Sequence, residues 1–63
     1  MRHNLKLARN KTGMTQQQVA DSLSISLVYY QKIEQGSRTG GYDIWDKLED
    51  LFRTSQRVLR VNE

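Results

Sequence analysis

The stretch TQQQVADSLSISLVYYQKIEQG, residues 15–36, decides the fold of this 63-residue chain. Its first half predicts a short helix that begins at Thr15. Gln18 follows three positions later, so the two residues can form a capping box, in which each side chain accepts the backbone N–H of the other residue. A narrow apolar stripe then continues at helical spacing, with Val19, Ala20 and Leu23 as its members.

A second helix is predicted directly after the first, because only residues 24–26, SIS, interrupt the helical pattern. Ser26 is a favourable N-cap residue, and Gly36 stands where a left-handed residue often ends a helix. Tyr30 and Ile33 are spaced to face the core. Two helices with so short a connection meet at a steep angle, which is the arrangement of a helix-turn-helix.

The pattern of this unit resembles that of the Xre-like, phage repressor/Cro-type DNA-binding domains. The residues that carry the resemblance are Gly13, Met14, Thr15, Gln16, Val19, Ala20, Leu23, Ile25, Ser26, Ile33, Glu34 and Gly36. The resemblance extends over about residues 2–52 and implies a compact all-α domain that binds double-stranded DNA. Ser24 departs from the family pattern, which usually has glycine there. A positive φ at this position would cost serine about 1 kcal/mol relative to glycine.

The remaining sequence predicts further helices around this unit. We expect one all-α domain, residues 1–63, with four to five helices at about 2–11, 15–23, 26–35, 43–52 and 55–61. Asp43 is the expected N-cap of the fourth helix. That helix has a broad apolar face made of Ile44, Trp45, Leu48, Leu51 and Phe52. A chain this short has a small core and no room for a second domain.

The composition narrows the class of protein. There are no cysteines, so neither a disulfide framework nor a thiolate metal site supports the fold. No run of apolar residues is long enough to span a membrane, and the first ten residues lack the apolar segment of a signal peptide. We therefore expect a cytoplasmic protein of a bacterial or phage-infected cell, associated with the nucleoid and not with a membrane.

Positive charge is concentrated in the first part of the chain. The net charge is +3 and the isoelectric point is about 9.6. Residues 1–38 contain six lysine and arginine residues against two acids, whereas residues 39–63 contain four against five. The predicted helix-turn-helix thus lies in the basic part, as binding to a polyanion requires.

Nothing in the sequence indicates an enzyme. His3 is the only histidine, and without a second histidine or a cysteine a metal site is not expected. The serines lie at turns and caps, and no general base is placed beside them. We expect no catalytic residues, no metal and no cofactor.

The resemblance implies one structural ion pair. Arg9 occupies the position at which the family has an arginine that pairs with the glutamate near the end of the recognition helix, here Glu34. An arginine suits this role because its planar guanidinium can donate two hydrogen bonds to one carboxylate.

The second helix of the unit should meet the bases. In a helix-turn-helix this helix lies in the major groove. Because Tyr30 and Ile33 face inward, the residues expected to face outward and contact bases are Leu27, Val28, Gln31 and Lys32. The two aliphatic residues can recognise only apolar features such as thymine methyl groups, whereas glutamine suits adenine and lysine suits guanine.

A second set of residues is expected to contact phosphates, which sets register without reading sequence. Free N–H groups at helix N-termini attract phosphates, and the predicted contacts on or near the helices are Lys6, Gln16, Ser26 and Tyr29. The resemblance adds the glycine-containing loop 36–42, whose candidates are Ser37, Arg38 and Thr39.

The C-terminal segment is expected to form a weak homodimer. Val58, Leu59 and Val61 cannot all face so small a core, and repressors that this chain resembles commonly dimerise near their last helix. The alternative is a frayed terminus.

Three functions remain open at this stage. The first is a sequence-specific transcriptional repressor from a phage or other mobile element. The second is the antitoxin of a toxin–antitoxin pair, which would repress its own operon. The third is a helix-turn-helix used to bind an unidentified protein through Leu27, Val28 and the adjacent tyrosines.

Overall fold

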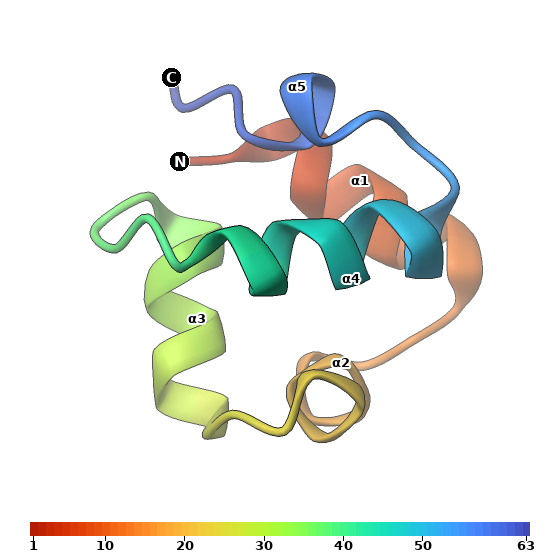
Figure 1. Ribbon diagram of the computed structural model, residues 1–63, viewed down its shortest axis with the longest axis vertical. Coiled ribbons are helices and arrows are strands. Elements are labelled where there is room, and N and C mark those ends of the chain that lie inside the picture. The colour runs from red at the N-terminus through yellow and green to blue at the C-terminus, as the bar shows by residue number, and fades with distance from the viewer.

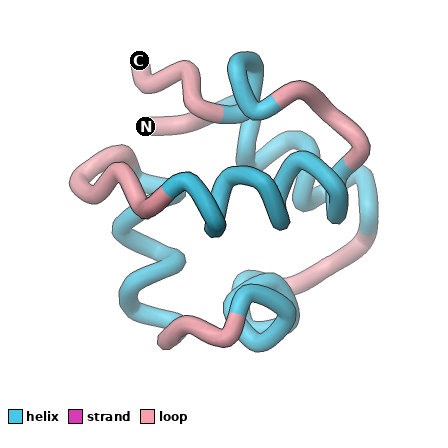
Figure 2. Tube along the Cα trace, viewed as in Figure 1, coloured by secondary structure: helices cyan, strands magenta, loops and turns pink.

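The chain folds into five helices and no strands, as the sequence predicted. The computed structural model describes all 63 residues. The helices are α1 (His3–Thr12), α2 (Gln16–Leu23), α3 (Leu27–Gln35), α4 (Tyr42–Phe52) and α5 (Gln56–Leu59). In Figure 1, α2 is seen almost end-on while α3 runs upward along the left side of the view, so the two helices cross at a steep angle. Figure 2 shows how short the turn between them is.

The predicted caps define the helix-turn-helix. The Gln18 N–H donates to Thr15 Oγ1 at 3.1 Å, and the Thr15 N–H donates to Gln18 Oε1 at 2.9 Å, so the capping box is confirmed. Ser26 caps α3 by accepting the Tyr29 N–H at 3.1 Å. Gly36 ends α3 with a φ of +91°.

Two residues other than glycine adopt the left-handed conformation. Ser24 ends α2 with a φ of +57°, and Arg53 ends α4 with a φ of +51°. The strain expected at Ser24 is therefore present, since L-residues with a Cβ disfavour this region.

The boundaries of the last two helices differ from the prediction. Gly41, not Asp43, is the N-cap of α4, and Asp43 lies in the first turn, where its carboxylate favours the positive end of the helix dipole. The helix α5 ends at Leu59 rather than near residue 61. The Ser55 side chain makes no cap hydrogen bond. Instead, the first N–H of the helix, from Gln56, donates to Glu49 Oε2 at 2.8 Å.

All five helices contribute to one core. Its buried apolar residues are Leu5, Val19, Ala20, Leu23, Tyr30, Ile33, Ile44, Trp45, Leu48, Phe52 and Leu59. The apolar face of α4 supplies four of them, with Trp45 the largest. None of the helices has the length and apolar character needed to cross a bilayer.

The burial of Leu59 corrects the prediction for the C-terminal edge. Leu59 has no exposed surface, whereas Val58 and Val61 are 45% and 40% exposed. A single turn of helix turns one of three neighbouring apolar residues inward, and that residue is Leu59. It is part of the core, so it cannot belong to an exposed dimer contact.

Candidate nucleic-acid interface

The helix α3 has a buried face and an outward face. Tyr30, Ile33 and Glu34 are buried. On the opposite side Val28 is 58% exposed and Lys32 is exposed. These two residues therefore lie where the rotation of the helix was predicted to place them.

The other two predicted base-reading residues are only half-buried. Leu27, at the start of α3, is partly covered. Gln31 turns toward α2, and its Nε2 donates to Gln16 Oε1 at 3.3 Å. This contact connects the first residue of α2 to the middle of α3.

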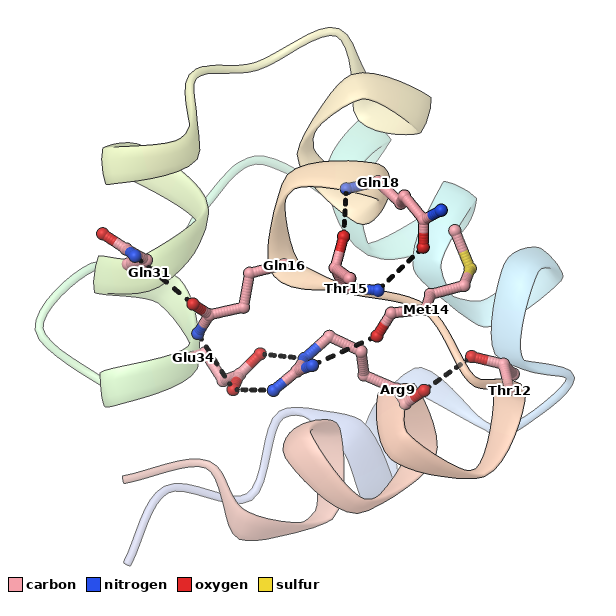
Figure 3. A network of polar contacts seen from close by, with 8 residues as sticks. All are labelled: Arg9, Thr12, Met14, Thr15, Gln16, Gln18, Gln31 and Glu34. Carbon is pink, nitrogen blue, oxygen red and sulfur yellow. Dashed lines mark hydrogen bonds and ion pairs between the residues drawn. The ribbon is translucent and has the colours of Figure 1, made fainter.

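Gln16 links Gln31 to the buried carboxylate of α3. Its Nε2 donates to Glu34 Oε1 at 3.3 Å, while its Oε1 accepts from Gln31. Figure 3 shows this chain of contacts from Gln31 through Gln16 to Glu34 and Arg9. Because Gln16 contacts both Gln31 and Glu34, its side chain is held in place between α2 and α3. The first N–H groups of α2 remain without intrahelical acceptors.

Arg9 and Glu34 form the ion pair that the resemblance implied. Arg9 Nε lies 3.0 Å from Glu34 Oε2, and Arg9 Nη2 lies 3.1 Å from Glu34 Oε1, so two parallel hydrogen bonds join the side chains. Their side chains are 12% and 2% exposed. Arg9 Nη1 also donates to Met14 O at 3.1 Å. The hydrogen bond to Glu34 raises the pKa of Arg9, and the pair fixes α3 against α1 (Figure 3).

The Tyr30 hydroxyl is buried beside this pair without a partner. It has no hydrogen bond of acceptable geometry. Burial, and then the charge of Glu34, raises the pKa of Tyr30, so the phenol stays neutral. The ring fills the core, whereas the hydroxyl contributes no hydrogen bond.

Comparison with known families decides what this geometry belongs to. A family model described as helix-turn-helix, of the Xre/Cro type, matches residues 5–56. The chain belongs to this helix-turn-helix family. No curated protein and no solved structure matches it. Membership implies DNA binding and a role in the regulation of transcription. The second helix of the motif, which in such domains is called the recognition helix, is α3.

The predicted phosphate-contacting residues lie at several places around the helix-turn-helix. Lys6 and Ser26 are exposed, and Tyr29 is half-buried against the core. The loop that follows the recognition helix exposes Ser37, Arg38 and Thr39. The Ser37 hydroxyl donates to Lys32 O at 3.3 Å, so it is already partly engaged within the chain.

Sequence reasoning missed one residue at this site, Arg2. It was counted with the surface charges, yet only 5% of it is exposed. Its acceptors are carbonyl oxygens of residues 33, 38 and 60, and its guanidinium lies 5.2 Å from the centroid of the Trp45 ring. Carbonyl oxygens leave no signature in a sequence, so only the fold shows that this arginine is internal.

The positive surface of the helix-turn-helix is consequently smaller than the sequence indicated. Of the six basic residues in positions 1–38, Arg2 and Arg9 are committed to internal contacts. The four that remain exposed are Lys6, Lys11, Lys32 and Arg38. Two of these, Lys32 and Arg38, belong to the recognition helix and to the loop after it.

Proposed function

We propose that the protein is a sequence-specific transcriptional regulator that binds double-stranded DNA, and that it is a small repressor of a phage or other mobile element. The observation that carries the DNA-reading part is the outward face of α3, where Val28 and Lys32 are exposed opposite the buried Tyr30 and Ile33. The helix is also braced by Arg9 through its pair with Glu34. Such a rigid, exposed helix face suits entry into the major groove.

Four residues of the recognition helix are assigned to base contacts: Leu27, Val28, Gln31 and Lys32. The Lys32 ammonium suits guanine, and the Val28 methyls suit a thymine methyl group. Gln31 reaches bases in the pose that its contact with Gln16 holds. Leu27, being half-buried, contributes with the exposed part of its side chain.

The phosphate contacts are assigned to seven residues around this face: Lys6, Gln16, Ser26, Tyr29, Ser37, Arg38 and Thr39. The start of α2 supports this assignment, because its first N–H groups have no intrahelical acceptor and attract anions. The four cations that stay exposed in residues 1–38 neutralise up to about four phosphates per protomer, which gives a log–log slope of affinity against salt of roughly −3.5.

A weak two-fold dimer is the assembly we assign to the bound state. One recognition helix spans few base pairs, and two-fold pairing places two of them about 34 Å apart on a near-palindromic site. Val58 and Val61 are exposed and available for this contact. Sedimentation of Val58→Asp beside the wild type checks it: the variant should dissociate, and a wild type that stays monomeric at high concentration on DNA contradicts the dimer.

The first experiment is capture of genomic DNA fragments by the purified protein, followed by sequencing and by affinity measurements on the recovered site at several salt concentrations. Lys32→Ala should weaken binding at least tenfold. Lys47→Ala is the matched control, because Lys47 is an exposed lysine of α4 outside the assigned interface. Equal losses in both variants would place the DNA elsewhere.

Sequence preference separates base contacts from phosphate contacts. Val28→Ala and Leu27→Ala should each reduce the difference in binding free energy between the recovered site and a scrambled site by about 1 kcal/mol, the low end of the cost of a mismatched base pair. Lys32→Ala should also weaken binding to the scrambled site only if the Lys32 ammonium contacts a phosphate. An unchanged preference in both apolar variants would remove them from the reading surface.

Two other functions are distinguished by the same capture. A site next to the protein's own promoter, together with a co-purifying toxin, favours the antitoxin. No recovered fragment and no dependence of DNA binding on salt favours the helix-turn-helix as a protein-binding module. The exposed Val28 supports that last function, because it offers no hydrogen bond to a base edge.

A further inference from the structure

Arg2 is a buried cation without a carboxylate partner. Its side chain is almost fully covered, and the only ion pair in the protein is Arg9–Glu34. The charge of Arg2 is therefore stabilised by carbonyl dipoles and by the face of the Trp45 ring. Burial, and then the charge of Arg60, lowers the pKa of Arg2, so the guanidinium is held at a place that does not favour its charge.

The acceptors of Arg2 come from three separate parts of the chain. Nη1 donates to Ile33 O at 2.6 Å and to Arg38 O at 2.7 Å, and Nε donates to Arg60 O at 3.2 Å. The backbone N–H of Arg2 also donates to Glu34 O at 2.9 Å. Two of the acceptors are at the C-terminal end of α3, where the helix dipole is negative.

The loop after α3 is held from inside by this guanidinium and by its neighbour Trp45. The indole Nε1 donates to Thr39 O at 2.6 Å, next to the Arg38 carbonyl that Arg2 binds. Both inward carbonyls of the loop are thereby satisfied, while the side chains of Arg38 and Thr39 point to the exposed surface. Arg2 lies over the Trp45 ring, so the two donors support each other.

The loop needs such support because its sequence is flexible. Residues 36–41 contain three glycines, which lose the most conformational entropy when they are ordered. At its start, Asn62 Nδ2 donates to Gly36 O at 3.1 Å, and Asn62 fills the space that a Cβ on Gly36 would need. The two chain ends lie together above the loop (Figure 1), joined by the Met1 N-terminus and Glu63 O.

We propose that Arg2 is a positioning residue for DNA binding: it ties the end of the recognition helix to the following loop, so that Arg38 meets a phosphate while α3 reads bases. The proposal rests on the proposed function, since it needs Arg38 to contact DNA. Arg2 itself is too deeply covered to contact DNA, and it acts through the backbone carbonyl of Arg38.

The test is a double-mutant cycle on the captured DNA site. Arg38→Ala removes one phosphate contact and lowers the magnitude of the salt slope by about 0.9. Arg2→Met keeps the apolar stem and should lower the slope by the same amount. The double variant should bind no more weakly than either single variant. Arg57→Ala, an exposed arginine of α5 outside the interface, is the matched control and should leave the slope unchanged.

A merely structural role is excluded by the slope. Partial unfolding lowers the active fraction of Arg2→Met but not the number of phosphates that each folded molecule contacts. Affinities are therefore measured well below the melting temperature. An unchanged slope, or losses in Arg2→Met and Arg38→Ala that simply add, overturns the proposal.

Amide hydrogen exchange without DNA gives the second readout. In Arg2→Met the hydrogen-bonded loop amides, those of Ser37 and Arg38, should lose about tenfold more protection than the amides of α2, whose rates change only with the global free energy of unfolding. Arg2→Lys keeps the charge, but its single ammonium cannot occupy both the Nη1 position, which donates to Ile33 O and Arg38 O, and the Nε position, which donates to Arg60 O. It should therefore also speed loop exchange, even if Arg2→Met does not fold. Loop exchange equal to the wild type overturns the proposal. A wild-type protein that binds no DNA overturns the proposed function itself. The slope comparison tests only the role of Arg2, because it compares proteins that bind DNA.

Discussion

Two arginines, at opposite ends of α1, hold the recognition helix in different ways. Arg9 pairs with the Glu34 carboxylate through two hydrogen bonds of about 3 Å. Arg2 has no carboxylate and donates to carbonyl oxygens of three segments. The first contact is between two opposite charges and fixes the body of α3 to α1. The second orients a loop, and its energy is spread over dipoles and an aromatic face.

The difference teaches how much each contact should matter to stability. Removing one partner of a buried ion pair leaves the other charge unpaired, which costs more than the pair itself contributes. Removing Arg2 leaves the carbonyl oxygens of Arg38 and Arg60 without a donor, whereas Ile33 O still accepts from the Gly36 N–H. It also removes the desolvation cost of a buried cation. Arg9 should therefore be the larger contributor to folding, and Arg2 the larger contributor to loop order.

The largest expected effect is that of Arg9→Ala. The variant leaves the Glu34 carboxylate buried with only Gln16 as donor, and the free energy of unfolding should fall by about 3–5 kcal/mol. Urea unfolding followed by circular dichroism measures it. In Arg9→Met combined with Glu34→Leu, much of the loss should be recovered. A single variant that melts within a degree or two of wild type while losing DNA binding would move Arg9 to the interface.

Arg2→Met should come second, with a loss of about 1–3 kcal/mol, comparable to hydrogen bonds made by a charged group. The loss is smaller than that of Arg9→Ala because no charge is left unpaired. The same unfolding measurement compares the two directly. If Arg2→Met proves more destabilising than Arg9→Ala, the carbonyl contacts hold the fold as well as the loop, and the division between the two arginines is wrong.

The contrast between the arginines also shows what sequence could predict. Thr15, Gln18 and Ser26 act through neighbours three residues away, so local chemistry revealed the caps and the turn. The Arg9–Glu34 contact spans 25 residues and was accessible only through the resemblance to a family. The acceptors of Arg2 are backbone oxygens, and they are separated from it by 31, 36 and 58 positions in the sequence. No residue type marks such a contact.

The misplaced elements have the same cause. The helix α5 has four residues, too few for apolar periodicity to show which side faces inward, so Leu59 was assigned to the surface. Gly41 caps α4 through its backbone, which a search for polar caps cannot find. What the sequence settled was the helix-turn-helix itself; the packing around it depended on contacts between distant segments.

A smaller effect of opposite sign should follow from relieving backbone strain away from both arginines. Ser24→Gly and Arg53→Gly each replace a residue of positive φ, and each should stabilise the protein by about 1 kcal/mol. Thermal unfolding of both, beside the double variant, measures whether the gains add. Gly13→Ala is the control in the reverse direction, because it places a Cβ at a φ of +74° with open space around it. No gain in either variant would mean that local hydrogen bonds offset the strain.

The smallest effect concerns the hydroxyl beside the ion pair. Tyr30→Phe removes a buried group that has no hydrogen bond, so at neutral pH the variant should be as stable as wild type or up to about 1 kcal/mol more stable. Tyr30→Ala is the contrast, because loss of the ring costs about 3–5 kcal/mol. A loss of more than 1 kcal/mol in Tyr30→Phe would show that Glu34 or Arg9 bonds the hydroxyl in solution.

The pH dependence of the same variant tests the environment of that hydroxyl. Burial first, and then Glu34, raises the pKa of Tyr30 above its ordinary value near 10. The folded protein thus keeps a proton that the unfolded chain releases, so this contribution to stability is complete below pH 10 and is lost as the pH rises above it. Above pH 10, the free energy of unfolding of the wild type should fall relative to that of Tyr30→Phe by up to about 1.4 kcal/mol per pH unit. Parallel curves for the two proteins would mean that the phenol reaches water in the folded state, and the site beside Arg9 would then be open rather than closed.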